Sequence, residues 1–149
     1  MSKKRVLILN GPNLNMLDQR DAKIYGGESL EKARDNCTQL AKELGIEVDF
    51  RQNNFEGEIV ENIQKAVGKF DGIIINAAAY THTSVAIRDA LEIFQGAKVE
   101  IHISNIYKRE KFRQKSYLSD IVDATIAGFG IKGYTLALLG ISNIIDQEI

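Results

Sequence analysis

The sequence has 149 residues, 44% of them hydrophobic and 26% charged, with a formal net charge of −1. This length suits one domain with a buried core, residues 1–149, and the charge gives no electrostatic reason to expect nucleic acid or a membrane as partner. The single cysteine, Cys37, excludes an internal disulfide, and the lack of any ~20-residue apolar stretch favours a soluble, cytoplasmic protein.

The first predicted strand, 5–9, is a continuous apolar run, which is typical of a strand covered on both faces. The stretch from Asn10 to Gly26 follows it and is longer than most strand-to-helix connections. Asn10-Gly11-Pro12 alone would indicate a tight turn, but Arg20 and Tyr25 add chemistry that a turn does not need. Because ligands of open parallel sheets bind beyond the carboxyl ends of the strands, we expect this stretch to form part of a site.

Helices and strands alternate along the rest of the chain. Apolar residues at helical spacing predict helices over 30–44, about 59–67, 84–94 and from Gly130 or Gly133 to about 144. In the helix over 84–94, we expect the inward residues to be Val85, Ala86, Ala90, Leu91 and Phe94. Further strands are predicted over 46–52, 72–76, 99–104 and 124–129, the last with a helix end as alternative. The alternation predicts an α/β protein, a flavodoxin-like doubly wound, five-stranded parallel sheet in three αβα layers.

Polar residues collect where the predicted strands end. Asn76 ends one strand, and the strand over 99–104 places Glu100, His102 and Ser104 on one face. A buried polar group without a partner costs about 1–3 kcal/mol, so these three need partners or a water-lined pocket. We favour a site with Glu100 orienting the imidazole; a buried hydrogen-bond network is the alternative.

Several common kinds of site are not indicated. Two histidines and one cysteine at unrelated positions are too few for a structural zinc site, so no metal is expected. The sequence has no G-x-G-x-x-G, P-loop or G-x-S-x-G motif, which argues against dinucleotides, nucleoside triphosphates and a serine nucleophile. The segment 107–115 is a charged run typical of a solvated surface, from which Phe112 and Arg113 stand out, because an arginine here can clamp a carboxylate.

The candidate residues fit one kind of reaction. A cation such as Arg20 beside Tyr25 would favour the phenolate, which can act as a base. A tyrosine base, a histidine acid and asparagine donors suit abstraction of a proton next to a carbonyl, with an enolate-like intermediate. Together with an arginine for a carboxylate, these residues predict elimination of water from a keto acid.

Motifs along nearly the whole chain, in one order and spacing, carry a family resemblance. They are Asn10-Gly-Pro-Asn-Leu-Asn, Ile24-Tyr-Gly, Asp49-Phe-Arg-Gln-Asn, Glu56-Gly-Glu, Ile75-Asn-Ala-Ala-Ala-Tyr-Thr-His-Thr-Ser-Val-Ala-Ile-Arg-Asp-Ala, Glu100-Ile-His-Ile-Ser-Asn and Arg109-Glu-Lys-Phe-Arg. The sequence thereby resembles type II 3-dehydroquinate dehydratase. The resemblance implies a dodecamer of four trimers and the shikimate-pathway dehydration of 3-dehydroquinate to 3-dehydroshikimate. It implies anti elimination through an enolate without Schiff base, metal or cofactor.

The resemblance also implies roles for single residues. Tyr25 would be the general base, Arg20 the cation that favours its phenolate and stabilises the transition state, and Asn13 the holder of a water that stabilises the enolate. His102 would donate the proton to the leaving hydroxyl, with Glu100 behind it. The residues implied in substrate binding are Asn76, His82, Ile103, Ser104 and Arg113, with Asp89 reaching the site of a neighbouring subunit.

The chain departs from the family pattern at a few positions. Ala78 stands where the family often has glycine, and Phe55 replaces a common histidine. Competing readings are a non-catalytic flavodoxin-like module that binds a small molecule such as flavin mononucleotide, a receiver domain, or an assembly scaffold. Biosynthesis of aromatic amino acids and breakdown of quinate use the same reaction, and the choice between them stays open.

Overall fold

Residues 3–147 are described by a computed structural model, which contains a five-stranded parallel sheet. The strands are β1 (Arg5–Asn10), β2 (Glu47–Gln52), β3 (Gly72–Asn76), β4 (Ala97–His102) and β5 (Ala124–Ala127). Their order is β2-β1-β3-β4-β5, and every neighbouring pair is parallel. This order is that of flavodoxin-like folds and confirms the predicted fold class. It also confirms a strand rather than a helix end near residue 125.

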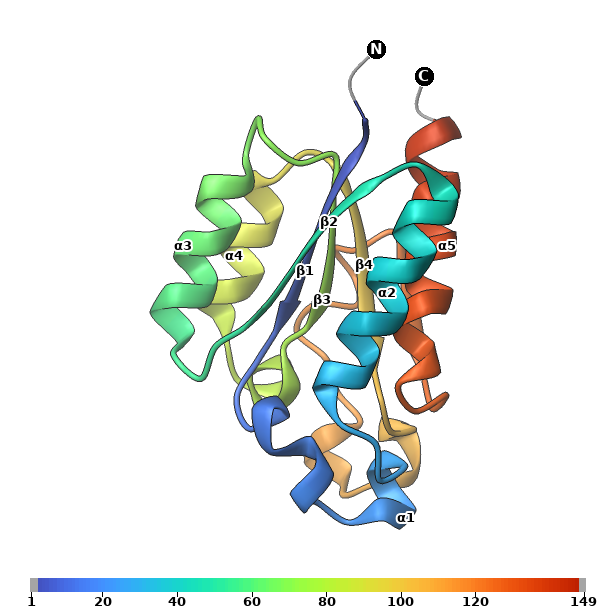
Figure 1. The fold of residues 1–149 in the computed structure, drawn as a ribbon. Helices are drawn as coiled ribbons and strands as arrows, with labels where there is room; N and C mark the ends of the chain where they lie inside the picture. Colours follow the sequence, from blue (N-terminus) through green and yellow to red (C-terminus); the bar gives the residue numbers. More distant parts are fainter. Residues whose placement is uncertain (1–2, 148–149) are drawn as a thin grey trace.

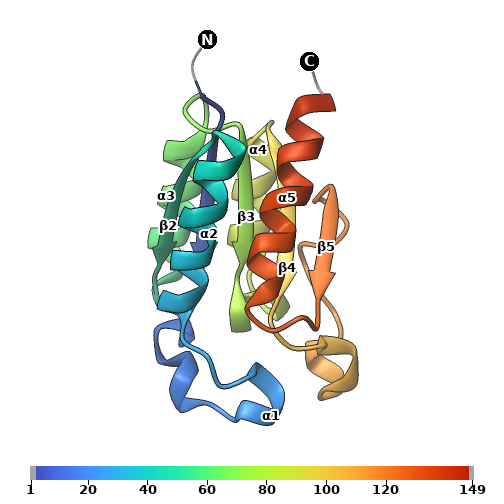
Figure 2. The same ribbon diagram turned by 45° about the vertical axis from the view of Figure 1, so that its right-hand side comes forward.

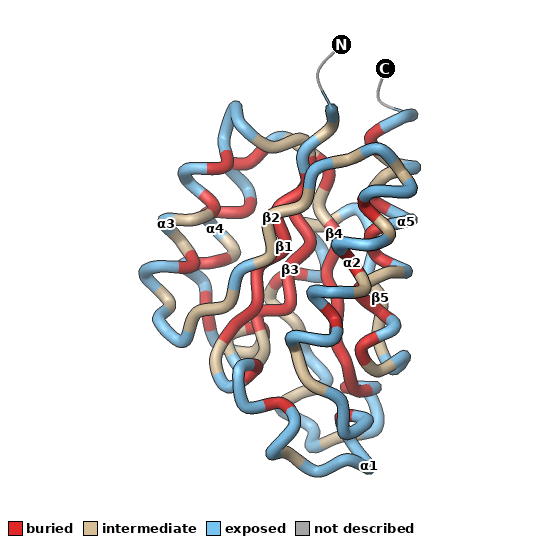
Figure 3. Tube along the Cα trace, viewed as in Figure 1, coloured by how far each residue is buried: buried red, intermediate tan, exposed pale blue. Residues whose placement is uncertain are grey.

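Helices cover both faces of the sheet, as Figures 1 and 2 show. The longer helices are α2 (Leu30–Leu44), α3 (Glu56–Ala66), α4 (Val85–Ile93) and α5 (Lys132–Gln147). Buried residues of α2 and α5 pack in one core cluster, and those of α3 and α4 pack in the other. The three inner strands β1, β3 and β4 are the most buried part of the sheet (Figure 3). The three αβα layers are therefore those expected from the sequence.

Helix α2 is capped at both of its ends. Ser29 Oγ accepts a hydrogen bond from the Lys32 N–H and caps α2, which ends at Gly45 with a left-handed φ of 69°. Cys37 lies fully buried on the inner face of α2, where burial raises the pKa of its thiol to about 12. Cys37 therefore belongs to the core.

The inward face of helix α4 differs from expectation. In α4, Val85 and Ala86 are exposed, and Ile87 packs inward instead. Helix α5 begins at Lys132, and at Gly133 it lies so close to the sheet that a Cβ would be 3.1 Å from Ile101 Cδ1. The buried side of α5 includes Tyr134. Among the described residues, no helix is long and apolar enough to cross a membrane.

Short helical turns gather at the carboxyl ends of the strands. After β1 come the 3-10 helix Leu14–Gln19 and helix α1 (Ala22–Tyr25), and after β3 comes the 3-10 helix Ala78–His82. Two more 3-10 turns, Ile106–Lys108 and Lys111–Arg113, follow β4. These segments lie together at the lower end of the molecule in Figure 1.

Candidate active site

A cleft of about 130 Å³ lies where these turns meet the ends of β3 and β4. All of the residues implied in the site line it except Glu100 and Asp89. The lining residues among them are Asn13, Arg20, Tyr25, Asn76, His82, His102, Ile103, Ser104 and Arg113. Segments far apart in the sequence are therefore brought to one place by the parallel sheet, as the polar strand ends predicted.

Tyr25 and Arg20 form one side of the cleft. The Asp21 side chain accepts a hydrogen bond from the Lys23 N–H and starts the short helix α1, which Gly26 ends with a left-handed φ of 86°. This turn brings Tyr25 back over Arg20. Arg20 Nη2 donates a hydrogen bond to the Tyr25 hydroxyl oxygen at 2.5 Å, and the guanidinium carbon is 4.0 Å from the ring centroid. The hydroxyl oxygen of Tyr25 is therefore held by a cationic hydrogen-bond donor.

His102 forms the floor on the β4 side, and Glu100 lies buried behind it. The His102 Nε2 and a Glu100 carboxylate oxygen are 2.5 Å apart, and both side chains are buried. Burial alone would raise the pKa of Glu100, but hydrogen bonds from His102, Ser119 and Ser116 outweigh it and hold that pKa below its usual value. The carboxylate is therefore a buried negative charge that orients the imidazole. The site and the buried network, considered as alternatives, coexist here.

His82 faces the cleft from the turn after β3. Its Nδ1 lies 2.8 Å from the carbonyl oxygen of Lys115, which can only accept, so the neutral ring carries its proton on Nδ1. Burial, assisted by the nearby positive Arg113, lowers the pKa of His82. His82 is thus suited to accept a hydrogen bond at Nε2, for example from a hydroxyl group.

The backbone near the cleft requires two unusual conformations and one glycine. Asn13 has a φ of 69°, and its N–H donates to Asn54 Oδ1 at 3.0 Å. Ala78 has a φ of 52°, a region in which glycine is favoured. Gly11 packs against the chain after β3, and a Cβ there would lie 2.4 Å from the Ala77 carbonyl oxygen. Strand ends β1 and β3 can therefore approach closely beneath the cleft.

Arg109 is a cleft residue to which the sequence reasoning gave no role. Its guanidinium carbon is 5.0 Å from the Tyr25 ring centroid, and its Nη1 donates to Ser104 Oγ at 3.4 Å. A second cation thus accompanies Tyr25. The available signal was its place at the start of the motif Arg109-Glu-Lys-Phe-Arg, four residues before Arg113, in the segment that follows β4. Phe112 is 62% exposed and does not line the cleft, so singling it out was wrong.

Three other residues of interest lie outside the cleft lining. Glu100 is completely buried behind His102. Asp89 is exposed on α4 and lines a separate surface depression with Arg88 and Tyr117. Asn10, which ends β1, is 1% exposed and held within the core. Within residues 3–147, no group of three or more His, Cys, Asp or Glu side chains is placed to hold a metal ion.

Comparisons with known proteins identify the family. The family model for dehydroquinase class II matches residues 4–142. The chain is 51% identical over 143 residues to a 3-dehydroquinate dehydratase of Campylobacter jejuni, covering 96% of this chain and 90% of the relative. It is 56% identical over 133 residues to the Bartonella tribocorum protein of the same name, covering 89% of each. The crystal structure of type II dehydroquinase from Butyrivibrio crossotus superposes with a TM-score of 0.92 at 43% identity, over 95% of this chain and 99% of that one. The chain therefore belongs to the class II dehydroquinase family.

Proposed function

We propose that this cleft eliminates water from 3-dehydroquinate through an enolate, with Tyr25 as general base and His102 as general acid. The activity itself follows from the family: the protein is a type II 3-dehydroquinate dehydratase, an enzyme of the shikimate pathway. The single observation that carries the mechanism is the placement of two pairs in one cleft, Arg20 with Tyr25 and Glu100 with His102.

The base half of the reaction belongs to Tyr25. As a phenolate, held by the N–H donor of Arg20, it takes a proton from the carbon next to the substrate ketone. The electron pair of the broken C–H bond passes into the enolate. Asn13, whose left-handed backbone is tied to Asn54, lies on the cleft wall and holds a water that donates to the enolate oxygen. Arg109 adds a second positive charge beside the ring of Tyr25.

The acid half belongs to His102. Its Nε2 is engaged by Glu100, which leaves Nδ1 to carry the transferred proton. The enolate collapses, the C–O bond breaks, and the hydroxyl leaves as water with this proton. The Glu100 carboxylate contacts Nε2 and holds the imidazole ring in place for the transfer. The base and acid act from opposite sides of the bond, as an anti elimination requires.

The remaining polar groups bind the substrate. Arg113 reaches the cleft from the turn after β4 and is suited to the substrate carboxylate, with Ile103 and Ser104 supplying backbone N–H groups beside it. Asn76 and His82 are placed for the hydroxyls: the amide can donate and His82 Nε2 can accept. These groups need no cofactor or metal.

The same proposal includes a homododecamer built from four trimers, with Asp89 contributing to the site of the neighbouring subunit. Asp89 lies on α4, whose outward face also carries Val85 at 55% exposure and Ile93 at 60%. Large apolar side chains exposed together on one face favour association with another chain. The complementation experiment in the Discussion tests whether Asp89 serves the site of a neighbouring subunit.

The stereochemistry of the elimination tests the mechanism. We would supply substrate carrying one deuterium on the carbon between the ketone and the carbon that bears the leaving hydroxyl. The deuterium anti to the hydroxyl should be lost to solvent, and the deuterium syn to it should remain in the product, as read by mass spectrometry. Loss of the syn deuterium instead would contradict the placement of Tyr25 and His102.

A further inference from the structure

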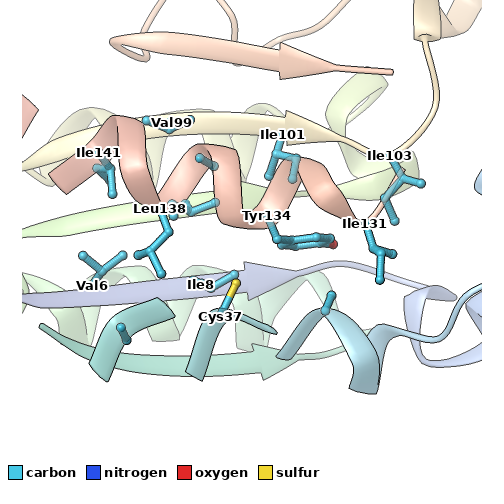
Figure 4. Close-up of a cluster of buried hydrophobic side chains, with 14 of the residues drawn as sticks. Val6, Ile8, Cys37, Val99, Ile101, Ile103, Ile131, Tyr134, Leu138 and Ile141 are labelled. Atoms are coloured by element: carbon cyan, nitrogen blue, oxygen red, sulfur yellow. The ribbon is translucent and has the colours of Figure 1, made fainter. Parts of the chain in front are cut away.

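A buried chain of hydrogen bonds joins helix α5 to the floor of the cleft. Tyr134 is fully buried, and Figure 4 shows its ring among apolar side chains with the hydroxyl oxygen directed toward the carboxyl end of β1. This hydroxyl donates to Asn10 Oδ1 at 2.5 Å, and Asn76 Nδ2 donates to the hydroxyl oxygen at 3.1 Å. A phenylalanine of the same shape would fill the core equally well, so packing does not explain the hydroxyl.

The hydrogen bond between Asn10 and Arg51 fixes the direction of the other hydrogen bonds in this row. Asn10 Nδ2 donates at 3.0 Å to the carbonyl oxygen of Arg51 in β2, and a carbonyl can only accept. The amide of Asn10 must therefore present its oxygen to Tyr134. The Tyr134 hydroxyl proton must point at that oxygen, which leaves the hydroxyl oxygen to accept from Asn76. Burial raises the pKa of the Tyr134 hydroxyl well above its usual value, so the proton stays in place.

The same chain fixes the amide of Asn76 at the cleft. Because Nδ2 of Asn76 faces Tyr134, its Oδ1 faces the other way and accepts from the Ala78 N–H at 3.2 Å. Ala78 is the residue with the left-handed φ of 52°. The second N–H of the Asn76 amide takes no part in these hydrogen bonds. Asn76 lines the cleft, whereas Tyr134 and Asn10 do not.

We propose that Tyr134 is a positioning residue for the dehydration: its hydroxyl sets the orientation of the Asn76 amide, so that the cleft offers an N–H donor to a substrate oxygen. The inference rests on the proposed role of Asn76 in substrate binding. Without the hydroxyl, Asn76 can rotate its amide and present an oxygen, which would repel a substrate oxygen that accepts hydrogen bonds. Tyr134 acts only through Asn76 and touches no substrate.

Tyr134→Phe is the direct test. Since one neutral hydrogen bond contributes about a factor of five to ten in affinity, we expect KM to rise roughly five- to tenfold while kcat changes by less than about twofold. Ile141→Val is the matched control, because Ile141 is a fully buried residue on the same face of α5 and takes no part in these hydrogen bonds. The control should lower the melting temperature without changing KM.

A double-mutant cycle separates positioning from independent effects. Asn76→Ala alone should raise KM, and adding Tyr134→Phe to it should change KM by less than about twofold, because the residue through which Tyr134 acts is gone. Asn10→Ala is a second variant in case Tyr134→Phe does not fold. It frees the hydroxyl proton of Tyr134 to turn toward Asn76, so it should also raise KM.

Three results would overturn the inference. A Tyr134→Phe enzyme with a lowered melting temperature but wild-type KM would make the hydroxyl purely structural. Multiplying effects in the double variant would show that Tyr134 acts independently of Asn76. An Asn76→Ala enzyme with wild-type KM would remove Asn76 from substrate binding, and that result is distinguishable because it contradicts the proposed function as well.

Discussion

Arg20 Nη2 donates a hydrogen bond to the hydroxyl oxygen of Tyr25 at 2.5 Å, and the same guanidinium lies over the Tyr25 ring. The two residues are five apart in sequence, and the short helix α1 between them closes the distance. Tyr25 is 6% exposed, lines the cleft and is held by a cation, and in the proposed mechanism it acts there as a phenolate. The proposed mechanism depends most on this relationship.

Tyr25→Phe should abolish catalysis while keeping the fold. The variant removes only one oxygen, so we expect kcat to fall by about 10³-fold or more, with a melting temperature close to wild type. Tyr107→Phe is the control, because Tyr107 is 58% exposed and does not line the cleft. Near-native turnover by Tyr25→Phe would remove Tyr25 from the mechanism.

Arg113→Ala should mainly weaken substrate binding. Loss of a charged hydrogen bond to a carboxylate costs about 1.5–3 kcal/mol, which corresponds to a KM raised by roughly 10- to 150-fold. Lys111→Ala removes an exposed positive charge from the same 3-10 turn and should leave KM within about twofold. If KM of Arg113→Ala were unchanged, Arg113 would belong to the solvated surface.

The sequence predicted those parts of the site that follow from periodicity. Continuous apolar runs ended by polar residues placed Asn76 and His102 at one edge, because parallel strands share the direction of their ends. Alternation along β4 correctly paired Glu100 with His102. The fold class followed from the same alternation of strands and helices.

Other features were beyond the sequence for physical reasons. A dense run of charges resembles a solvated surface, so neither the position of Arg109 beside Tyr25 nor the exposure of Phe112 was visible. In α4, Val85 and Ala86 are apolar but face outward, and hydrophobicity alone does not tell a core face from an exposed one. The contact of Tyr134 with Asn10 joins residues 124 positions apart, which no local pattern encodes.

Asp89 can be tested by complementation between subunits. Tyr25→Phe and Asp89→Ala should each be nearly inactive alone. If Asp89 serves the neighbouring site, mixed assemblies refolded together at equal amounts should regain activity at about one site in four. The matched control mixes Tyr25→Phe with His102→Ala, whose missing groups belong to one chain's site and should not complement. Failure of the first mixture to regain activity would contradict the shared site.

Glu100→Gln should change how stability depends on pH. The pKa of Glu100 is lower in the folded than in the unfolded protein, so the unfolded state binds more protons as the pH falls. The stabilisation by Glu100 is complete above the pKa of its carboxyl group in the unfolded protein, ~4.3, and is lost as the pH drops through the pKa in the folded protein. We therefore expect the free energy of unfolding of the wild type to fall in acid. The Glu100→Gln variant should be less stable at pH 7 but should lose less stability as the pH falls. Denaturant titrations at several pH values measure this, and parallel curves would contradict it.

Ala78→Gly should not destabilise the protein, unlike most alanine-to-glycine changes. The left-handed φ of Ala78 costs an L-residue about 1–2 kcal/mol, whereas glycine loses about 0.5–1 kcal/mol in entropy. We expect the free energy of unfolding to stay level or rise by up to about 1 kcal/mol. Ala86→Gly, on the exposed face of helix α4, is the control and should lower it by about 1 kcal/mol. A loss at Ala78 as large as at Ala86 would contradict the strain argument.

The measurement that tests the central claim most directly is a spectrophotometric assay with 3-dehydroquinate, following the conjugated product. It would be run with a chelator present and with borohydride as a trap for a Schiff base. The account predicts full turnover under both conditions, since Tyr25, Arg20 and His102 supply the chemistry themselves. Inactivation by borohydride in the presence of substrate, or loss of turnover with the chelator, would contradict the enolate mechanism.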